Sequence, residues 1–194
     1  ILISFYEEFY PQEAIDAYMK AYEINPERNK DILTKISSMY SDAEDYAKAA
    51  EVMQKFVDMG DASLTDYYTL SNRYKNLALT LPEGSAELKE AAQNGIKYID
   101  LALESAADES KGTLLQNKAS LLMTRDGTDP TPELVETYKA MLAAYDLNPE
   151  NKTKRAGAYK SAYGFIANDY RVKGDKENAR IYFQKLLEVD PENQ

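Results

Sequence analysis

The stretch that decides the fold is AYEINPE at residues 21–27, because it returns as AYDLNPE at 144–150 and as LLEVDPE at 186–192. Proline has no amide hydrogen and disfavours helical geometry in the residue before it, so each copy predicts the end of a helix. Upstream of each copy, apolar residues recur at spacings of three and four, which is one face of an amphipathic helix. The sequence therefore predicts one type of helix that recurs along the chain.

The last copy belongs to a larger pattern that spans two helices. The residues that carry this pattern are Tyr163, Ile166, Ala167 and Tyr170 on a first helix, Gly174 and Asp175 in a turn, and Ala179, Phe183, Leu186 and Pro191 on a second helix. They resemble the tetratricopeptide repeat (TPR) family, which has an aromatic residue, a Leu-Gly pair and Tyr on one helix, then Ala, Phe and Pro on its partner. Ala167 stands in place of the family's Gly.

Earlier segments carry the same pattern with irregularities. One copy consists of Leu33, Ile36, Ser37, Tyr40, Ala49, Met53 and Phe56. The next comprises Tyr67, Leu70, Ser71, Tyr74, Gly95, Ile99 and Ala102, with an insertion around 81–86, and a fourth comprises Leu115, Ala119, Leu122, Thr137, Met141 and Ala144, with an insertion at 127–132. We therefore predict a single domain, 1–194, with a partial repeat at 1–28 and repeats at about 30–63, 64–108, 112–150 and 152–193.

The resemblance implies an all-α fold, namely a right-handed superhelical solenoid of antiparallel helix pairs (a TPR-like α-α superhelix). One amphipathic pair cannot bury both apolar faces, so neighbouring pairs are expected to stack on one another. Small residues such as Ser37 and Ala167 would allow close helix approach, and the aromatic residues would fill the remaining space. If Phe183 and Tyr170 are fully buried, truncating either to Ala should cost about 3–5 kcal/mol.

The composition argues against several classes of function. The chain has 23 basic and 33 acidic residues, a formal charge of -10, so it should repel nucleic acid and anionic membranes. It has no Cys and no His, which removes thiolate and imidazole metal ligands and the usual proton shuttles of neutral pH. No apolar run is long enough for membrane insertion, and no phosphate-binding motif is present. We therefore expect that the protein is not an enzyme and that it binds neither a cofactor nor a metal ion.

The resemblance also implies where a partner would bind. In the family, the first helix of each pair lines a concave groove that holds a partner peptide or helix, so the expected function is that of a protein–protein interaction scaffold. The resemblance puts these residues in the groove: Lys35, Ser38, Tyr68, Asn72, Lys75, Gln116, Asn117, Asn168 and Arg171. Amides can pair with a peptide backbone and the cations can receive carboxylates, so we expect a protein or peptide partner of acidic or carboxyl-terminal character.

Two other functions fit the same fold. The stack could self-assemble through exposed repeat ends, which would make the protein a homo-oligomer, with Ile1, Leu2 and Phe5 at one such end. Alternatively, an exposed Tyr68 could contact glycans, since helical repeats occur in bacterial glycan-uptake proteins; that function would place the protein in the bacterial periplasm or cell envelope. The sequence is also compatible with the cytoplasm.

Overall fold

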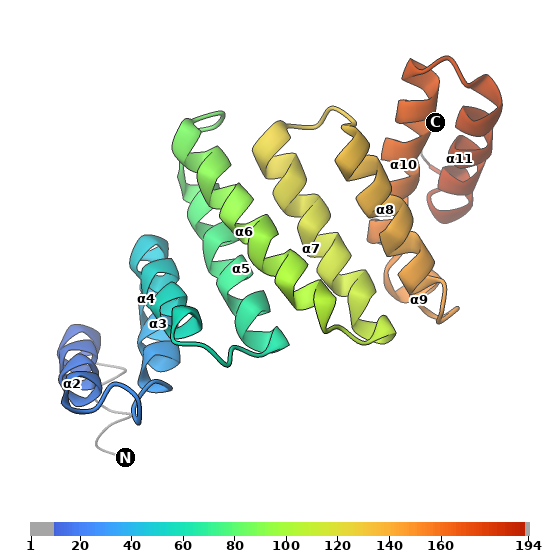
Figure 1. The fold of residues 1–194 in the computed structure, drawn as a ribbon. Coiled ribbons are helices and arrows are strands. Elements are labelled where there is room, and N and C mark those ends of the chain that lie inside the picture. Colours follow the sequence, from blue (N-terminus) through green and yellow to red (C-terminus); the bar gives the residue numbers. More distant parts are fainter. Residues whose placement is uncertain (1–9, 193–194) are drawn as a thin grey trace. The chain divides into compact units, whose positions relative to one another are not determined.

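The computed structural model describes residues 10–192, and every regular element in that range is an α-helix (Figure 1). The helices are α2 (Pro11–Ile24), α3 (Ile32–Asp42), α4 (Tyr46–Asp58), α5 (Leu64–Thr80), α6 (Ala86–Glu104), α7 (Asp108–Asp126), α8 (Pro132–Tyr145), α9 (Asn151–Lys154), α10 (Ala156–Val172) and α11 (Lys176–Val189). The prediction of an all-α fold of helix pairs is confirmed. The chain divides into two compact units between Ala102 and Leu103. The predicted single domain of residues 1–194 stays a prediction.

Small polar residues join the helices of each pair in the first unit. The Ser37 hydroxyl of α3 donates a hydrogen bond of 2.8 Å to the Ala49 carbonyl of α4. The Ser71 hydroxyl of α5 donates one of the same length to the Gly95 carbonyl of α6. Both serines are fully buried, and their small side chains let the helix backbones approach closely. The repeated small position of the sequence pattern is therefore a packing position.

Apolar residues of α2 to α6 form the core of the first unit. One cluster consists of Tyr22, Leu33, Met53, Phe56, Leu70 and Tyr98. A second cluster, Ala14, Ile15, Ile36 and Met39, packs α2 against α3. These residues are buried because the apolar stripes of successive amphipathic helices face one another. The interaction of α2 with α3 thus continues the packing at the amino-terminal side of the first full pair.

The second unit contains the pairs α7–α8 and α10–α11, and aromatic rings join them. The ring of Tyr145 in α8 stacks on that of Tyr159 in α10, with 6.2 Å between the centroids. Ring contacts then continue from Tyr159 to Tyr163, from Tyr163 to Tyr182 in α11, and from Tyr182 to Tyr170. We call these five residues the tyrosine series. Ring contacts of this geometry add stability beyond the area that the rings bury.

The predicted insertions lengthen helices more than they lengthen loops. The helices α5 and α6 have 17 and 19 residues, and only residues 81–85 separate them. The helix α7 also has 19 residues, and its connection to α8 is residues 127–131. Extra turns of helix satisfy their own backbone hydrogen bonds, whereas a long loop would leave them to solvent.

Two sequence-based expectations are wrong in detail. The proline at 149 predicts a helix end at Asn148, but α8 already ends at Tyr145, and the backbone amide of Asn148 donates to the Tyr145 carbonyl in the turn that follows. The side chain of Phe183 is 39% exposed, since no helix of the described residues packs on that face of α11. Met53 and Met141 hold the same place in earlier repeats and are 1% and 0% exposed, because α5 and α10 pack against their helices. Ile1, Leu2 and Phe5 lie outside the described residues.

Candidate functional site

The polar side chains predicted for the groove in the first unit lie on α3 and α5. Lys35 is exposed, whereas Ser38, Tyr68, Asn72 and Lys75 are half-buried. We call these five residues the first-helix face. Burial lowers the pKa of the Lys75 ammonium, because the charged form loses solvation. The face therefore combines neutral hydrogen-bonding groups with cations.

Arg73 holds α3 and α5 together beside this face. Its guanidinium donates hydrogen bonds to the hydroxyls of Ser37 at 3.3 Å, Ser38 at 3.2 Å and Ser41 at 2.6 Å. Burial lowers the pKa of Arg73, but a guanidinium stays charged in proteins. All three partners are neutral, and no carboxylate among residues 10–192 forms an ion pair with Arg73. Sequence reasoning missed this residue because its role depends on three serines of another helix.

In the second unit, the predicted groove residues interact with their own unit. Gln116 is exposed on α7, and its side-chain oxygen accepts a hydrogen bond of 2.7 Å from the Tyr145 hydroxyl. Asn117 is buried, with 9% of its surface exposed. The Arg171 guanidinium of α10 donates to the side-chain oxygen of Asn168 at 2.7 and 3.1 Å. A partner that used these groups would have to replace the existing hydrogen bonds.

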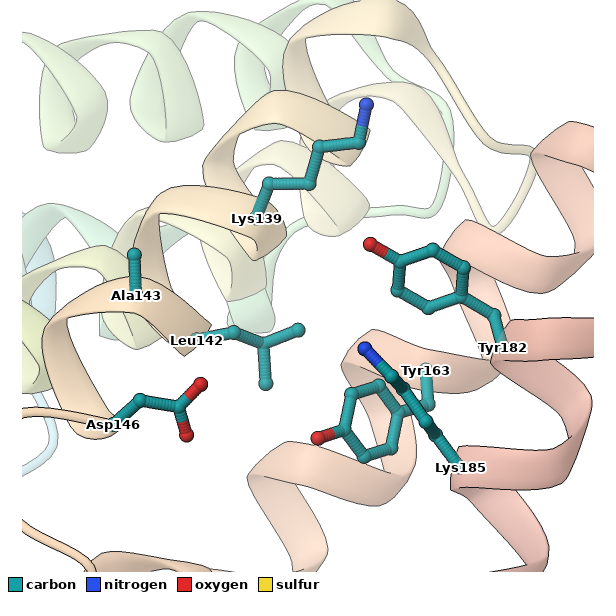
Figure 2. A pocket seen from close by; sticks show the side chains of 7 residues that line it. All are labelled: Lys139, Leu142, Ala143, Asp146, Tyr163, Tyr182 and Lys185. Carbon is teal, nitrogen blue, oxygen red and sulfur yellow. The ribbon is translucent and has the colours of Figure 1, made fainter. Parts of the chain in front are cut away.

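A pocket of about 210 Å³ lies between α8, α10 and α11 in the same unit (Figure 2). Its lining residues are Lys139, Leu142, Ala143, Asp146, Tyr163, Tyr182 and Lys185. Sequence reasoning did not single out this site. The available signal was a spacing: Leu142 and Ala143 of α8 and Asp146 at its C-cap follow Lys139 by three, four and seven positions and so lie on one side of the helix.

Each charged group of the pocket already contacts a neighbour. Lys139 pairs with Glu136 at 2.9 Å. The Lys185 ammonium lies 5.0 Å from the centroid of the Tyr182 ring and 5.9 Å from that of Tyr163, which is within the range of cation–π attraction.

The pocket's phenols and carboxylate form a second set of contacts. The Asp146 carboxylate accepts a hydrogen bond of 2.7 Å from the hydroxyl of Tyr159. Burial raises the pKa of Tyr163, and the charges of Asp146 and Glu188 raise it further, so its phenol stays neutral and able to donate. The site thus offers aromatic rings, a leucine side chain, two ammonium groups and one carboxylate.

No group of three or more acidic side chains within residues 10–192 is arranged to hold a metal ion. None of the helices in that range combines the length and the apolar character that crossing a bilayer requires.

Residues 161–193 match the family model of the tetratricopeptide repeat, which is 33 of the 194 residues. No curated protein matches the chain in sequence. Among solved structures, MamA is 22% identical, with a TM-score of 0.60 over 92% of this chain and 87% of that chain. The C-terminal part of a TPR repeat-containing protein from Cytophaga hutchinsonii is 17% identical, with a TM-score of 0.70 over 93% of this chain and 63% of that chain.

A third solved structure, YrrB, is described as a TPR protein with an unusual peptide-binding site. It is 17% identical, with a TM-score of 0.63 over 98% of this chain and 84% of that chain. These matches confirm the predicted resemblance: the carboxy-terminal helix pair fits the repeat model in sequence, and the chain has the fold of TPR proteins. At such identities the likeness is one of fold.

Proposed function

We propose that this stack of tetratricopeptide repeats is a non-catalytic scaffold that binds a carboxylate-bearing peptide or helix on the first-helix face. The observation that carries the proposal is Arg73, a half-buried cation beside that face whose hydrogen bonds all go to neutral hydroxyls, although the charge of Asp42 also acts on it. A guanidinium has five N–H donors, and the three serines use one on each nitrogen. The remaining two donors match the geometry of a carboxylate.

The neighbouring side chains support the same type of ligand. Lys35 and Lys75 add positive charge on α3 and α5, and the amide of Asn72 can both donate and accept hydrogen bonds with a peptide backbone. Because Lys75 is half-buried, an ion pair there would be less screened by solvent than one at an exposed position. YrrB, with a similar fold, has a peptide-binding site, which makes a peptide ligand a reasonable first test.

Selection of short random peptides on the immobilised protein tests the proposal. We expect the selected peptides to be enriched in Asp and Glu or to depend on a free carboxyl terminus. Lys75→Glu should weaken their binding by about tenfold, equal to about 1.4 kcal/mol. The matched control is Lys89→Glu, the same change at an exposed position on α6, and it should leave binding unchanged. Peptides without acidic bias, or equal binding by both variants, would contradict the proposal.

Arg171 extends this test to the second unit, where it was predicted to receive a carboxylate. It is exposed on α10 and already donates to Asn168, which a ligand would have to displace. We expect Arg171→Glu to weaken binding of the selected peptides several-fold, and the addition of Lys75→Glu to weaken it further. Unchanged affinity in the double variant would rule out the groove residues as the binding surface.

Self-assembly is a second candidate function, favoured by the outer face of α11. Phe183 and Leu187 are 39% and 44% exposed, and their spacing of four places them on one side of the helix. In a homodimer, this side of one copy would cover the same side of the other. Light scattering should then show a dimer that resists dilution and that Phe183→Glu dissociates. A monomer at all concentrations would exclude this function.

A further inference from the structure

We propose that the pocket between α8, α10 and α11 is a second binding site, which accepts an aromatic side chain of a partner peptide together with an adjacent carboxylate. The inference goes beyond the scaffold function proposed above, because none of the predicted groove residues lines this pocket. Two of its three walls come from α8 and α11, the second helices of their pairs. It can therefore be occupied or altered independently of the first-helix face.

The size of the pocket suits one side chain. Its volume of about 210 Å³ lies below the roughly 300–1,000 Å³ of typical small-molecule sites. The lining includes the side chains of Leu142 and Ala143 and the rings of Tyr163 and Tyr182 (Figure 2). Aromatic rings prefer offset or edge-to-face contacts with other rings, and apolar walls favour burial of apolar surface. An aromatic side chain satisfies both preferences.

The charges favour an acidic neighbour beside that side chain. Lys139 and Lys185 lie on different helices, and both line the pocket. The ion pair of Lys139 is with Glu136, whose side chain is 71% exposed, and such exposed pairs are weak enough to be exchanged. Lys185 forms no ion pair with any residue in the described range and contacts only aromatic rings. A ligand carboxylate could therefore pair with Lys185, while Lys139, whose ammonium points away from that of Lys185 (Figure 2) and lies 5.5 Å from the centroid of the Tyr170 ring, adds positive charge at the other end of the lining.

A basic ligand fits the pocket less well, although Asp146 is present. Asp146 lies seven residues after Lys139 in the same segment, about 10 Å along a helix axis, and Tyr159 already donates to its carboxylate. The faces of Tyr163 and Tyr182, where a ligand cation would bind, are already approached by the ammonium of Lys185. A second cation there would be repelled, whereas an anion would be attracted.

Tryptophan fluorescence offers a direct test, because the chain contains no Trp and the signal comes from the probe alone. The probe is the peptide acetyl-Gly-Trp-Asp-Gly-amide, and its charge-reversed partner is acetyl-Gly-Trp-Lys-Gly-amide. We expect a saturable blue shift with the acidic peptide and binding about tenfold weaker, or absent, with the basic one. Equal binding of the two peptides would overturn the assignment of a carboxylate. Equal binding of free N-acetyltryptophan would overturn the assignment of a peptide.

Two matched pairs of variants connect the signal to the pocket. Ala143→Leu fills the pocket from α8, and Ala140→Leu places the same side chain at an exposed position of that helix outside the lining. Lys185→Gln removes an ammonium group from the pocket, and Lys176→Gln removes one at an exposed position of α11 outside it. The pocket variants should each weaken binding of the acidic probe by about tenfold, and the controls should leave it unchanged.

Further measurements distinguish binding in the pocket from loss of folding and from binding at the first-helix face. Helical circular dichroism checks each variant, and Lys185→Gln keeps the test decisive if Ala143→Leu does not fold, since Lys185 is exposed. Equal binding by Lys185→Gln and Lys176→Gln would overturn the pocket assignment. Because the acidic probe could also bind the first-helix face, the pocket variants are compared in the Lys75→Glu background as well, where Lys185→Gln should still weaken probe binding by about tenfold relative to Lys176→Gln. No probe binding by Lys75→Glu alone would assign the probe to the first-helix face and refute the second site.

Discussion

At the scale of single residues, Gly112 shows how closely α7 and α8 approach. A β-carbon built at this position would overlap the ring atoms of Tyr145. The same ring stacks on Tyr159, and its hydroxyl donates to Gln116, so it cannot move without losing these contacts. Gly112 therefore allows α7 and α8 to pack closely, at a helical position where alanine would otherwise be preferred.

We predict that Gly112→Ala destabilises the protein. Overpacking costs about 1–3 kcal/mol, which exceeds the gain of up to about 1 kcal/mol expected for replacing a helical Gly by Ala. The measurement is urea unfolding followed by circular dichroism. The matched control is Gly164→Ala in α10, where the nearest atom is 4.0 Å from the new β-carbon, and that change should be neutral or stabilising. A more stable Gly112→Ala protein would show that Tyr145 can move aside.

Phe183 and Met141 hold the same place in two repeats but should differ in their contribution to stability. Met141 is fully buried, so Met141→Ala should cost about 2–5 kcal/mol. Phe183 is 39% exposed, so Phe183→Ala should cost only about 1–2 kcal/mol in a monomer. Denaturant titrations of both variants measure the difference. An equal loss for the two would mean that another surface covers Phe183 in solution.

At the scale of helices, side-chain caps set where several elements begin. Asp45 begins α4 by accepting a hydrogen bond from the Lys48 amide, and Asp175 begins α11 by accepting one from the Asn178 amide. Hydrogen bonds from the side chains of Lys48 and Asn178, and then from these amides, lower the pKa of each carboxyl below its ordinary value of 3.8. The same caps satisfy backbone amides that the first turn of a helix leaves without partners.

These caps predict part of the acid sensitivity of the protein. A carboxyl with a lowered pKa in the folded state stabilises the fold above its unfolded pKa, and this contribution is lost as the pH falls through the folded pKa. Serine can cap a helix without ionising. In the double variant Asp45→Ser and Asp175→Ser, the melting temperature should therefore fall less than in the unmutated protein between about pH 7 and about pH 3.

Asp31 provides the control for this experiment. It stands at the N-cap of α3, but its side chain makes no capping hydrogen bond. Asp31→Ser should therefore leave the difference in melting temperature between neutral and acid pH as it is in the unmutated protein. If the double variant behaves in the same way, the two caps do not contribute to acid unfolding.

At the scale of the whole molecule, the features that the sequence predicts best are those with local causes. The period of the apolar residues and the prolines after AYEIN and LLEVD predict helices that end at the caps Asn25 and Asp190, as observed. The small positions Ser37, Ser71, Ala119 and Ala167 are all buried, as the repeat pattern requires. Local spacing determines these features, so no knowledge of distant contacts is needed.

Features that depend on contacts between helices could not be predicted in this way. The serine partners of Arg73 lie 32 to 36 residues away from it in the sequence. The pocket combines residues of three helices, α8, α10 and α11, which belong to two different helix pairs. The exposure of Phe183 depends on which helix follows in space, whereas the repeat pattern treats every copy alike. The predicted groove residues lie on α3, α5, α7 and α10, and their role as a binding surface stays a prediction; their intramolecular hydrogen bonds, such as that of Gln116, required the structure.

The tyrosine series has a consequence at alkaline pH. Burial raises the pKa of Tyr159 and Tyr163 above the ordinary value of 10.0, and the carboxylate of Asp146 raises both further. Since only the unfolded chain ionises these phenols readily, stability is complete below about pH 10 and declines as the pH rises above it. Because the chain has 16 tyrosines, the expected signature is a step in phenolate absorbance that coincides with loss of helical circular dichroism. That step is a built-in optical reporter of unfolding, which requires no added dye.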